Sequence, residues 1–201
     1  IGGQLINWPQ HLIEFLIKND FRPIVYDNRD TGLSSRIQND SFNKDNVNKT
    51  IIRNYIKYYL RLPIKSEYTI DDMADDGVSV LDHLNIENAH ILGISMGGMI
   101  AQIMASSYPE KTKTFTQIAS TVSTPSPFNG PSKDVRRLFI ERTKNVDATI
   151  EDRVNRTKKL FKLIGYQGID LDTQEFSDNV KLSIERGGVD DTGFGRQLTA
   201  I

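Results

Sequence analysis

One short stretch of the chain combines residue types that could carry out nucleophilic chemistry. It reads Gly93-Ile94-Ser95-Met96-Gly97, and the apolar run from Ala89 to Ile94 that leads into it is typical of a buried strand. The apolar residues that follow recur at helical spacing: Met99, Ile100, Ile103 and Met104. Glycines beside such a strand-to-helix turn let the two backbones approach without Cβ clashes. The pattern therefore predicts a strained Ser95 with an exposed hydroxyl, the geometry of a serine nucleophile.

The backbone amide of Met96 adds a second chemical group at the same turn. It lies at the expected start of the helix and points toward the place where the serine hydroxyl would react, which makes it a candidate oxyanion donor. We interpret Gly93, Gly97 and Gly98 as the structural residues of the turn. The alternative is a glycine-rich turn with an incidental serine. Chance yields roughly 0.07 such triplets in a chain of this length, so the surrounding strand and helix signals favour the nucleophile.

Composition bounds the class of protein. The chain has 201 residues, 38% hydrophobic and 25% charged, which suits a soluble globular domain or a domain with a lid. A net charge of −1 gives no reason to expect nucleic acid or an anionic membrane as a partner. Without cysteine there is no disulfide, thiol chemistry or Cys-ligated metal, and no apolar run approaches the ~20 residues of a membrane span. The absence of cysteine does not decide the compartment; we expect a cytoplasmic protein with no metal and no cofactor.

Helix and strand signals alternate through the first part of the chain. Apolar spacing predicts one helix that ends near Asn19 and a short one from Thr50 to Leu60. Ile24–Asp27 and Lys113–Ala119 are predicted to be strands parallel to Ala89–Ile94, which should lie between them. This alternation predicts an α/β fold with a parallel sheet covered by helices on both faces.

A capping box opens the helix that precedes the central strand. Thr69-Ile70-Asp71-Asp72 matches the pattern, and Asp75 and Asp76 add further carboxylates to the first two turns. Acidic side chains at this end favour the helix dipole. A metal or acid–base site is the less favoured interpretation of the same cluster.

The character of the sequence changes after Ser120. Residues 120–132 hold three prolines among Ser and Thr, which is typical of a linker, and residues 132–201 are mostly helical in pattern. We interpret residues 1–122 as a core and residues 123–201 as a helical lid, or cap. The first half of the lid is rich in Lys and Arg, and a solvated helix face is favoured there over a site for an acidic ligand.

Three landmarks together resemble the α/β-hydrolase superfamily: Gly2-Gly3-Gln4 running to Trp8, the loop from Tyr26 to Ser34, and the Gly93–Gly98 turn. The second landmark has Asp-Thr-Gly in place of the commoner Gly-x-Gly, and so is similar to the aclacinomycin methylesterase-like branch of carboxylic ester hydrolases. The resemblance implies a partial α/β-hydrolase fold with a lid. It also implies that the loop before the first helix supplies a second oxyanion amide, from Ile1 or from a residue before it.

Two members of the triad that this resemblance implies have no candidate in the sequence. In such enzymes the acid and the histidine follow the nucleophile, whereas His11, His83 and His90 all precede Ser95. His90 opens the strand that leads to Ser95, which puts it roughly 16 Å away at ~3.3 Å per residue. We therefore expect a piece of a longer protein, truncated at both ends, and expect residues 1–201 alone not to hydrolyse esters through a complete triad.

The implied activity is that of a serine hydrolase acting on a small-molecule ester through Ser95. Related C–C hydrolases, cofactor-free haloperoxidases, acyltransferases and iminopeptidases share this serine and stay open as alternatives. Dehalogenases and epoxide hydrolases of this fold are disfavoured because they use Asp at the position. A non-catalytic ligand-binding protein is the alternative from another class, since fold alone does not determine function. The intact serine turn favours the enzyme.

Overall fold

The computed structural model describes residues 1–37, 46–122, 131–144, 148–187 and 191–201. The contacts within the chain divide it into two compact units. One unit comprises Lys57–Gly130, Arg196–Ile201 and Ile1, and the other comprises Gly2–Ile56 and Pro131–Gly195.

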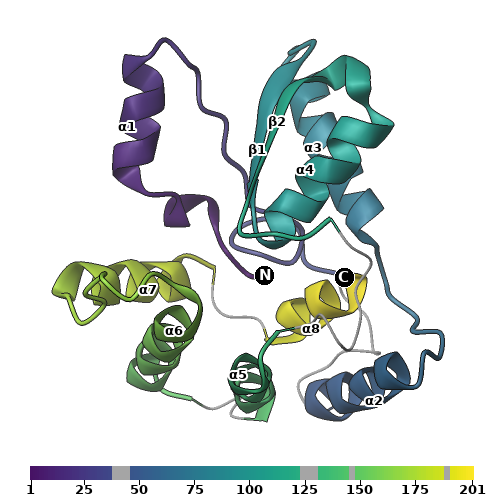
Figure 1. Cartoon of the computed structure of the whole chain (residues 1–201), viewed down its shortest axis with the longest axis vertical. Coiled ribbons are helices and arrows are strands. Elements are labelled where there is room, and N and C mark those ends of the chain that lie inside the picture. Colours follow the sequence, from purple (N-terminus) through teal and green to yellow (C-terminus); the bar gives the residue numbers. More distant parts are fainter. Residues whose placement is uncertain (38–45, 123–130, 145–147, 188–190) are drawn as a thin grey trace. The chain divides into compact units, whose positions relative to one another are not determined.

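The first unit contains a two-stranded parallel sheet. β1 (Ala89–Ile94) pairs with β2 (Thr112–Ile118), in a register that sets His90 opposite Thr114 and Ile94 opposite Ile118. α4 (Met96–Ser107) and the short η2 (Pro109–Lys111) connect the two strands. Figure 1 shows α4 alongside both strands, with α3 (Ile70–His83) packed against α4. This β-α-β unit is the building block of α/β folds.

Apolar side chains between α3 and α4 form the core of this unit. Met73, Ala74 and Leu81 of α3 are buried, as are Ile100 and Met104 of α4. Each such side chain contributes about 1.5–3 kcal/mol when fully buried, with Ala contributing less.

Polar contacts at the rim of this core use two of the acidic side chains of α3. The Tyr108 hydroxyl donates a hydrogen bond to Asp75 at 2.5 Å, and Lys111 forms an ion pair with Asp82. Asp75, which the sequence left open as part of a possible metal cluster, thus has a structural partner. Among the residues with described positions, no group of three or more His, Cys, Asp or Glu side chains could hold a metal ion.

The predicted capping box at the start of α3 is confirmed. The Thr69 N–H donates to Asp72 Oδ2 at 2.7 Å, and the Asp72 N–H donates back to Thr69 Oγ1 at 3.2 Å. Two amides that the helix leaves without partners are satisfied in this way. An equivalent box of Thr149 and Asp152 opens α6.

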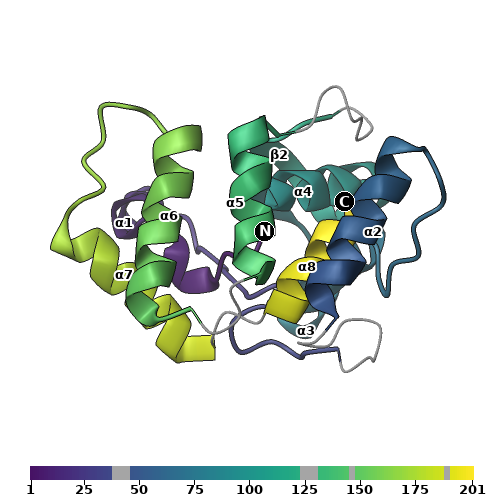
Figure 2. The same cartoon turned by 90° about the horizontal axis from the view of Figure 1, so that it is seen from below.

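The second unit is helical in its described parts. Its elements are η1 (Leu5–Asn7), α1 (Gln10–Lys18), α5 (Lys133–Lys144), α6 (Ile150–Ile164) and α7 (Gln174–Gly187). Figure 2 shows α5, α6 and α7 as successive neighbours, and an edge-to-face contact of Phe161 with Phe176 at 5.7 Å joins α6 to α7. α2 (Val47–Tyr59) and α8 (Asp191–Ala200) each have residues in both units. The helical pattern expected after residue 132 is therefore confirmed.

One predicted strand is wrong. Residues 21–28 form no strand, so Ile24–Asp27 does not pair with β1, and β1 has β2 as its single neighbour in the described sheet. The physical reason is that a strand exists only when a neighbour completes its hydrogen-bond ladder. The described residues of the second unit include no strand that could pair with this segment. Val25 is also 36% exposed, so the apolar run is not the buried element that its composition indicates.

Within the described ranges, no helix has both the length and the apolar character that crossing a membrane requires.

The capping box generates a prediction about stability. We expect Thr69→Ala to lower the free energy of unfolding by about 1 kcal/mol, because the amide of Asp72 loses its acceptor. Thr69→Ser keeps the hydroxyl and should cost only a few tenths of that amount. Urea unfolding followed by circular dichroism measures both values, and equal losses in the two variants would show that the hydroxyl is not what stabilises α3.

Candidate active site

Ser95 lies at the junction of β1 and α4 in a backbone conformation that few residues other than glycine adopt. Its φ is 54° and its ψ is −122°. The backbone is held from both sides, because the Ser95 N–H donates to the Ile118 carbonyl at 3.0 Å and the Ser95 carbonyl accepts from the Gly98 N–H at 2.9 Å. The residue is exposed. The last link of the sheet and the first turn of the helix thus fix an exposed hydroxyl in a strained position.

Close backbone approach explains the glycine that precedes this turn. A Cβ atom on Gly93 would overlap the carbonyl oxygen of Gly97, which is backbone and cannot move aside. A Cβ on Gly98 would come within 2.7 Å of the Ser120 Cβ. A Cβ on Gly97 would meet nothing within 4 Å. The need for glycine thus differs among the three positions. Gly93 is the one at which the absence of a side chain lets the strand and the helix come into contact.

Two backbone amides follow Ser95 in the first turn of α4. The N–H groups of Met96 and Gly97 make no hydrogen bond with any described residue, as expected for the first amides of a helix. The Met96 side chain is 4% exposed and anchors this first turn in the core. The start of a helix of this length favours negative charge. A hydroxyl next to two such donors has the parts needed to attack a carbonyl carbon and to stabilise the oxyanion that forms.

The remaining predicted oxyanion donor is Ile1. Ile1 belongs to the same compact unit as Ser95, whereas Gly2 and the residues after it belong to the other unit. Its participation stays a prediction.

The histidines of the described structure lie away from this turn or in the other unit. His90 is at the start of β1, where its Nδ1 is 2.8 Å from the Thr114 hydroxyl, and the strand then runs on to Ser95. At ~3.3 Å per residue that separation is roughly 16 Å, far beyond hydrogen-bond reach. His83 is in the last turn of α3, and His11 is on α1 in the second unit. The geometry therefore gives His90 no role as a base for Ser95.

Comparison with known proteins identifies the family. The model of the alpha/beta hydrolase fold family matches residues 1–161. The chain belongs to this family. A hydrolase from Pseudomonas aeruginosa PA01 has the same fold, with a TM-score of 0.59 at 18% identity over 100% of this chain and 60% of that one.

Curated relatives of this α/β-hydrolase chain include two rhodomycin D methylesterases. DnrP of Streptomyces peucetius is 26% identical and DauP of Streptomyces sp. (strain C5) is 27% identical, in each case over 94% of this chain and 61% of the relative. 3-Oxoadipate enol-lactonase 2 of Acinetobacter baylyi is 30% identical over 55% of this chain and 31% of its own. The chain thus spans about three fifths of the length of the two methylesterases.

Sequence reasoning missed a second strained position in this α/β-hydrolase chain. Ala119 follows β2 with φ 47°, and the hydroxyl of the next residue, Ser120, is buried without a hydrogen-bond partner beside Gly98. Leaving a buried hydroxyl unsatisfied costs about 1–3 kcal/mol. The position of Ala119 and Ser120 directly after a predicted strand could have pointed to them, because the carboxyl ends of paired parallel strands meet at one edge of the sheet.

The contact between Gly93 and Gly97 generates a prediction about stability. We expect Gly93→Ala to destabilise the protein by about 2 kcal/mol or more, because the added methyl group meets a backbone carbonyl that cannot move. Gly97→Ala is the matched control, since its methyl group has open space and alanine favours helix by up to about 1 kcal/mol. Thermal and urea unfolding compare the two. A Gly97→Ala variant as unstable as Gly93→Ala would contradict the close approach.

Proposed function

We propose that the protein containing this chain is a serine hydrolase that cleaves a small-molecule carboxylic ester, with Ser95 as its nucleophile. The observation that carries the proposal is the exposed, strained Ser95 next to the amides of Met96 and Gly97, which make no hydrogen bond within the described part of the chain. The names of similar proteins support it, because a methylesterase and an enol-lactonase both act on ester bonds. No residue of this site calls for a metal or a cofactor.

In the proposed reaction, Ser95 Oγ attacks the ester carbonyl and gives up its proton to a base. The negative charge that develops on the carbonyl oxygen is stabilised by the amide of Met96, and each such donor is worth about 3 kcal/mol. The proton then passes to the departing alcohol, and water hydrolyses the acyl-enzyme by the same steps. Ile1 is the proposed second donor. A histidine outside those already placed, oriented by a carboxylate, would serve as the base.

The strain at Ser95 argues against a purely ligand-binding role. A residue other than glycine at this φ costs of order 1–3 kcal/mol, and such positions persist mainly where a function uses them. A receptor pocket has no need of a serine held in this way. We also propose that residues 123–201 act as the lid that selects the substrate. A cytoplasmic location and a lack of nucleic-acid or membrane partners remain predictions.

Replacing the nucleophile tests the proposal. In the complete gene product, we expect Ser95→Ala to abolish labelling by a fluorophosphonate probe and to lower turnover of short p-nitrophenyl esters by about a thousandfold or more. Ser106→Ala is the control, because Ser106 is exposed at the far end of the same helix and should keep both activities. Ester turnover that survives in Ser95→Ala would refute the assignment.

The placement of the histidines generates a separate prediction. A true general base contributes about 10²–10⁴-fold, so its loss is unmistakable. We expect His83→Ala and His90→Gln to keep kcat/KM within about threefold of the wild type, because His90 hydrogen-bonds Thr114 at the far end of β1. Steady-state ester hydrolysis measures this. A hundredfold loss in either variant would mean that its imidazole reaches Ser95.

A further inference from the structure

The residues that follow β2 lie against the first turn of α4. β2 ends at Ile118, and Ala119 follows it with φ 47°. A Cβ atom on Gly98 would lie 2.7 Å from the Ser120 Cβ and 2.8 Å from its Oγ, so the Ser120 side chain touches the backbone of the helix. The end of β2 is therefore packed directly against the turn that Ser95 opens.

Two backbone hydrogen bonds link this contact to Ser95. The Ser95 N–H donates to the Ile118 carbonyl at 3.0 Å, and the Ser95 carbonyl accepts from the Gly98 N–H at 2.9 Å. Gly98 in turn touches Ser120, which is two residues from Ile118 along the chain. The contacts thus form a closed ring, and all of its members belong to the first compact unit. A shift of Gly98 or Ser120 would therefore displace Ser95.

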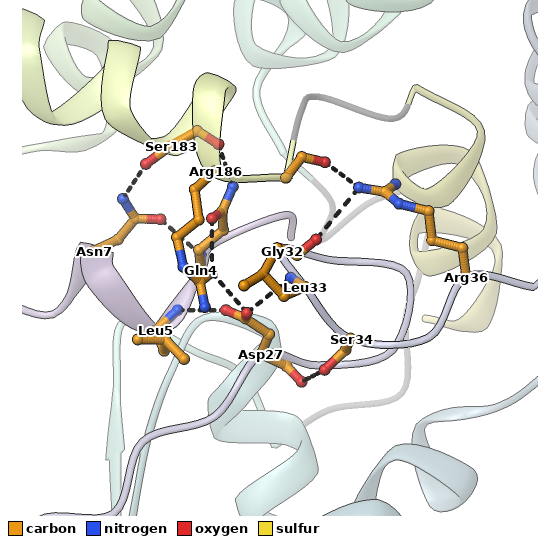
Figure 3. A network of polar contacts seen from close by, with 11 residues as sticks. Gln4, Leu5, Asn7, Asp27, Gly32, Leu33, Ser34, Arg36, Ser183 and Arg186 are labelled. Atoms are coloured by element: carbon orange, nitrogen blue, oxygen red, sulfur yellow. Dashed lines mark hydrogen bonds and ion pairs between the residues drawn. The ribbon is translucent and has the colours of Figure 1, made fainter.

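A buried polar group in the second unit shows how a side chain is held by hydrogen bonds. The Asp27 side chain is 3% exposed and accepts from the Leu5 N–H at 2.7 Å, the Leu33 N–H at 3.0 Å and Arg186 Nη1 at 2.7 Å (Figure 3). The Ser120 hydroxyl is also buried, but no residue with a described position forms a hydrogen bond with it. An unsatisfied hydroxyl lowers stability. The contact of Ser120 with α4 is therefore steric rather than polar.

We propose that Ser120 is a positioning residue, whose Cβ holds the first turn of α4 at the distance from β2 that sets the direction of the Ser95 hydroxyl. The inference rests on the proposed function. Gly98 transmits the contact, because its N–H bonds the Ser95 carbonyl. The amides of Met96 and Gly97 lie between these two residues, so the proposed oxyanion donors move with the same turn. Reaction rates respond strongly to such shifts, since a misplacement of about 1 Å can cost about a hundredfold.

The conformation of Ala119 supports positioning over simple packing. Alanine has no preference for positive φ, and a residue other than glycine persists there only where its surroundings hold it. Because the φ of Ala119 sets the direction of the residues after it, the strained turn and the contact of Ser120 with Gly98 go together. Strain and an unsatisfied hydroxyl, neither of which stabilises the fold, thus coincide beside the proposed nucleophile. Such features cluster at active sites.

The test moves the Cβ of this contact from one residue to the other, in the complete gene product. We expect Gly98→Ala to lower kcat at least about tenfold with KM nearly unchanged, because its Cβ overlaps that of Ser120 and displaces the turn. Ser120→Gly removes the contact and should lower kcat at least about fivefold. The double variant should recover to within about threefold of the wild type, because the methyl group on residue 98 restores the contact. Gln117 Cγ, 2.9 Å from the same point, can move by rotation of its side chain.

Amide hydrogen exchange at Ser95 reports the state of the turn without any substrate. The Ser95 N–H bonds the Ile118 carbonyl, so exchange should accelerate in both single variants and return toward the wild-type rate in the double variant. Ser106→Gly is the control for a loss of stability alone. Ser106 is exposed at the far end of α4, and glycine weakens a helix, so this variant should unfold more easily and keep the wild-type kcat.

The outcomes separate this inference from the proposed function. With an active wild type, an unchanged kcat in Ser120→Gly would overturn the positioning role. A double variant whose loss is the product of the two single losses would also overturn it, because the two residues would then act independently. A wild-type protein with neither probe labelling nor ester turnover would sink the proposed function, and the positioning role with it. If Gly98→Ala does not fold, Ser120→Gly decides alone, since it adds no atom to the contact.

Discussion

The contact between the backbone of Gly93 and the carbonyl of Gly97 is the constraint on which the candidate site depends. Strand and helix can meet in so short a turn only because no side chain separates them. The short turn then forces the residue between them into an unusual conformation, and Ser95 has φ 54° as a result. That conformation leaves Ser95 exposed next to the amides of Met96 and Gly97, which bond no residue with a described position. The positions of the proposed nucleophile and of the proposed oxyanion donors thus follow from a single steric requirement.

The surrounding unit supplies the stability that such a turn requires. Strain of about 1–3 kcal/mol at Ser95 is offset by the paired strands on one side and by the buried helix on the other. The Ser95 N–H still takes part in the ladder with β2, and Met96, Ile100 and Met104 bury one side of α4. The helix therefore cannot relax away from the sheet without exposing its core face. Rigid support of this kind is what a reactive group needs to hold its geometry.

Local features of the structure were predictable from sequence, and long-range ones were not. The serine turn, the capping box at Thr69 and the helices after residue 132 depend on neighbours a few residues away, so spacing reveals them. The strand expected at Ile24–Asp27 failed because pairing depends on a partner that composition does not specify. The partner of Asp27 is 159 residues away, and nothing local to either residue indicates the pair. Ser120 was missed for a similar reason, since its neighbour Gly98 lies on a different element.

The distribution of backbone strain offers an independent view of where function lies. Among the described residues other than glycine, positive φ occurs at Asp20, Asp30, Arg61, Asn85, Ser95 and Ala119. Asp and Asn adopt this region readily, so three of the six need no special explanation. Ser95 and Ala119 follow directly after Ile94 and Ile118, which face each other across the sheet. Two residues without a preference for this conformation therefore adopt it side by side, at the carboxyl edge where open α/β sheets bind their ligands. The short turn accounts for the strain at Ser95, and the proposed reaction would use the edge at which both strained residues lie.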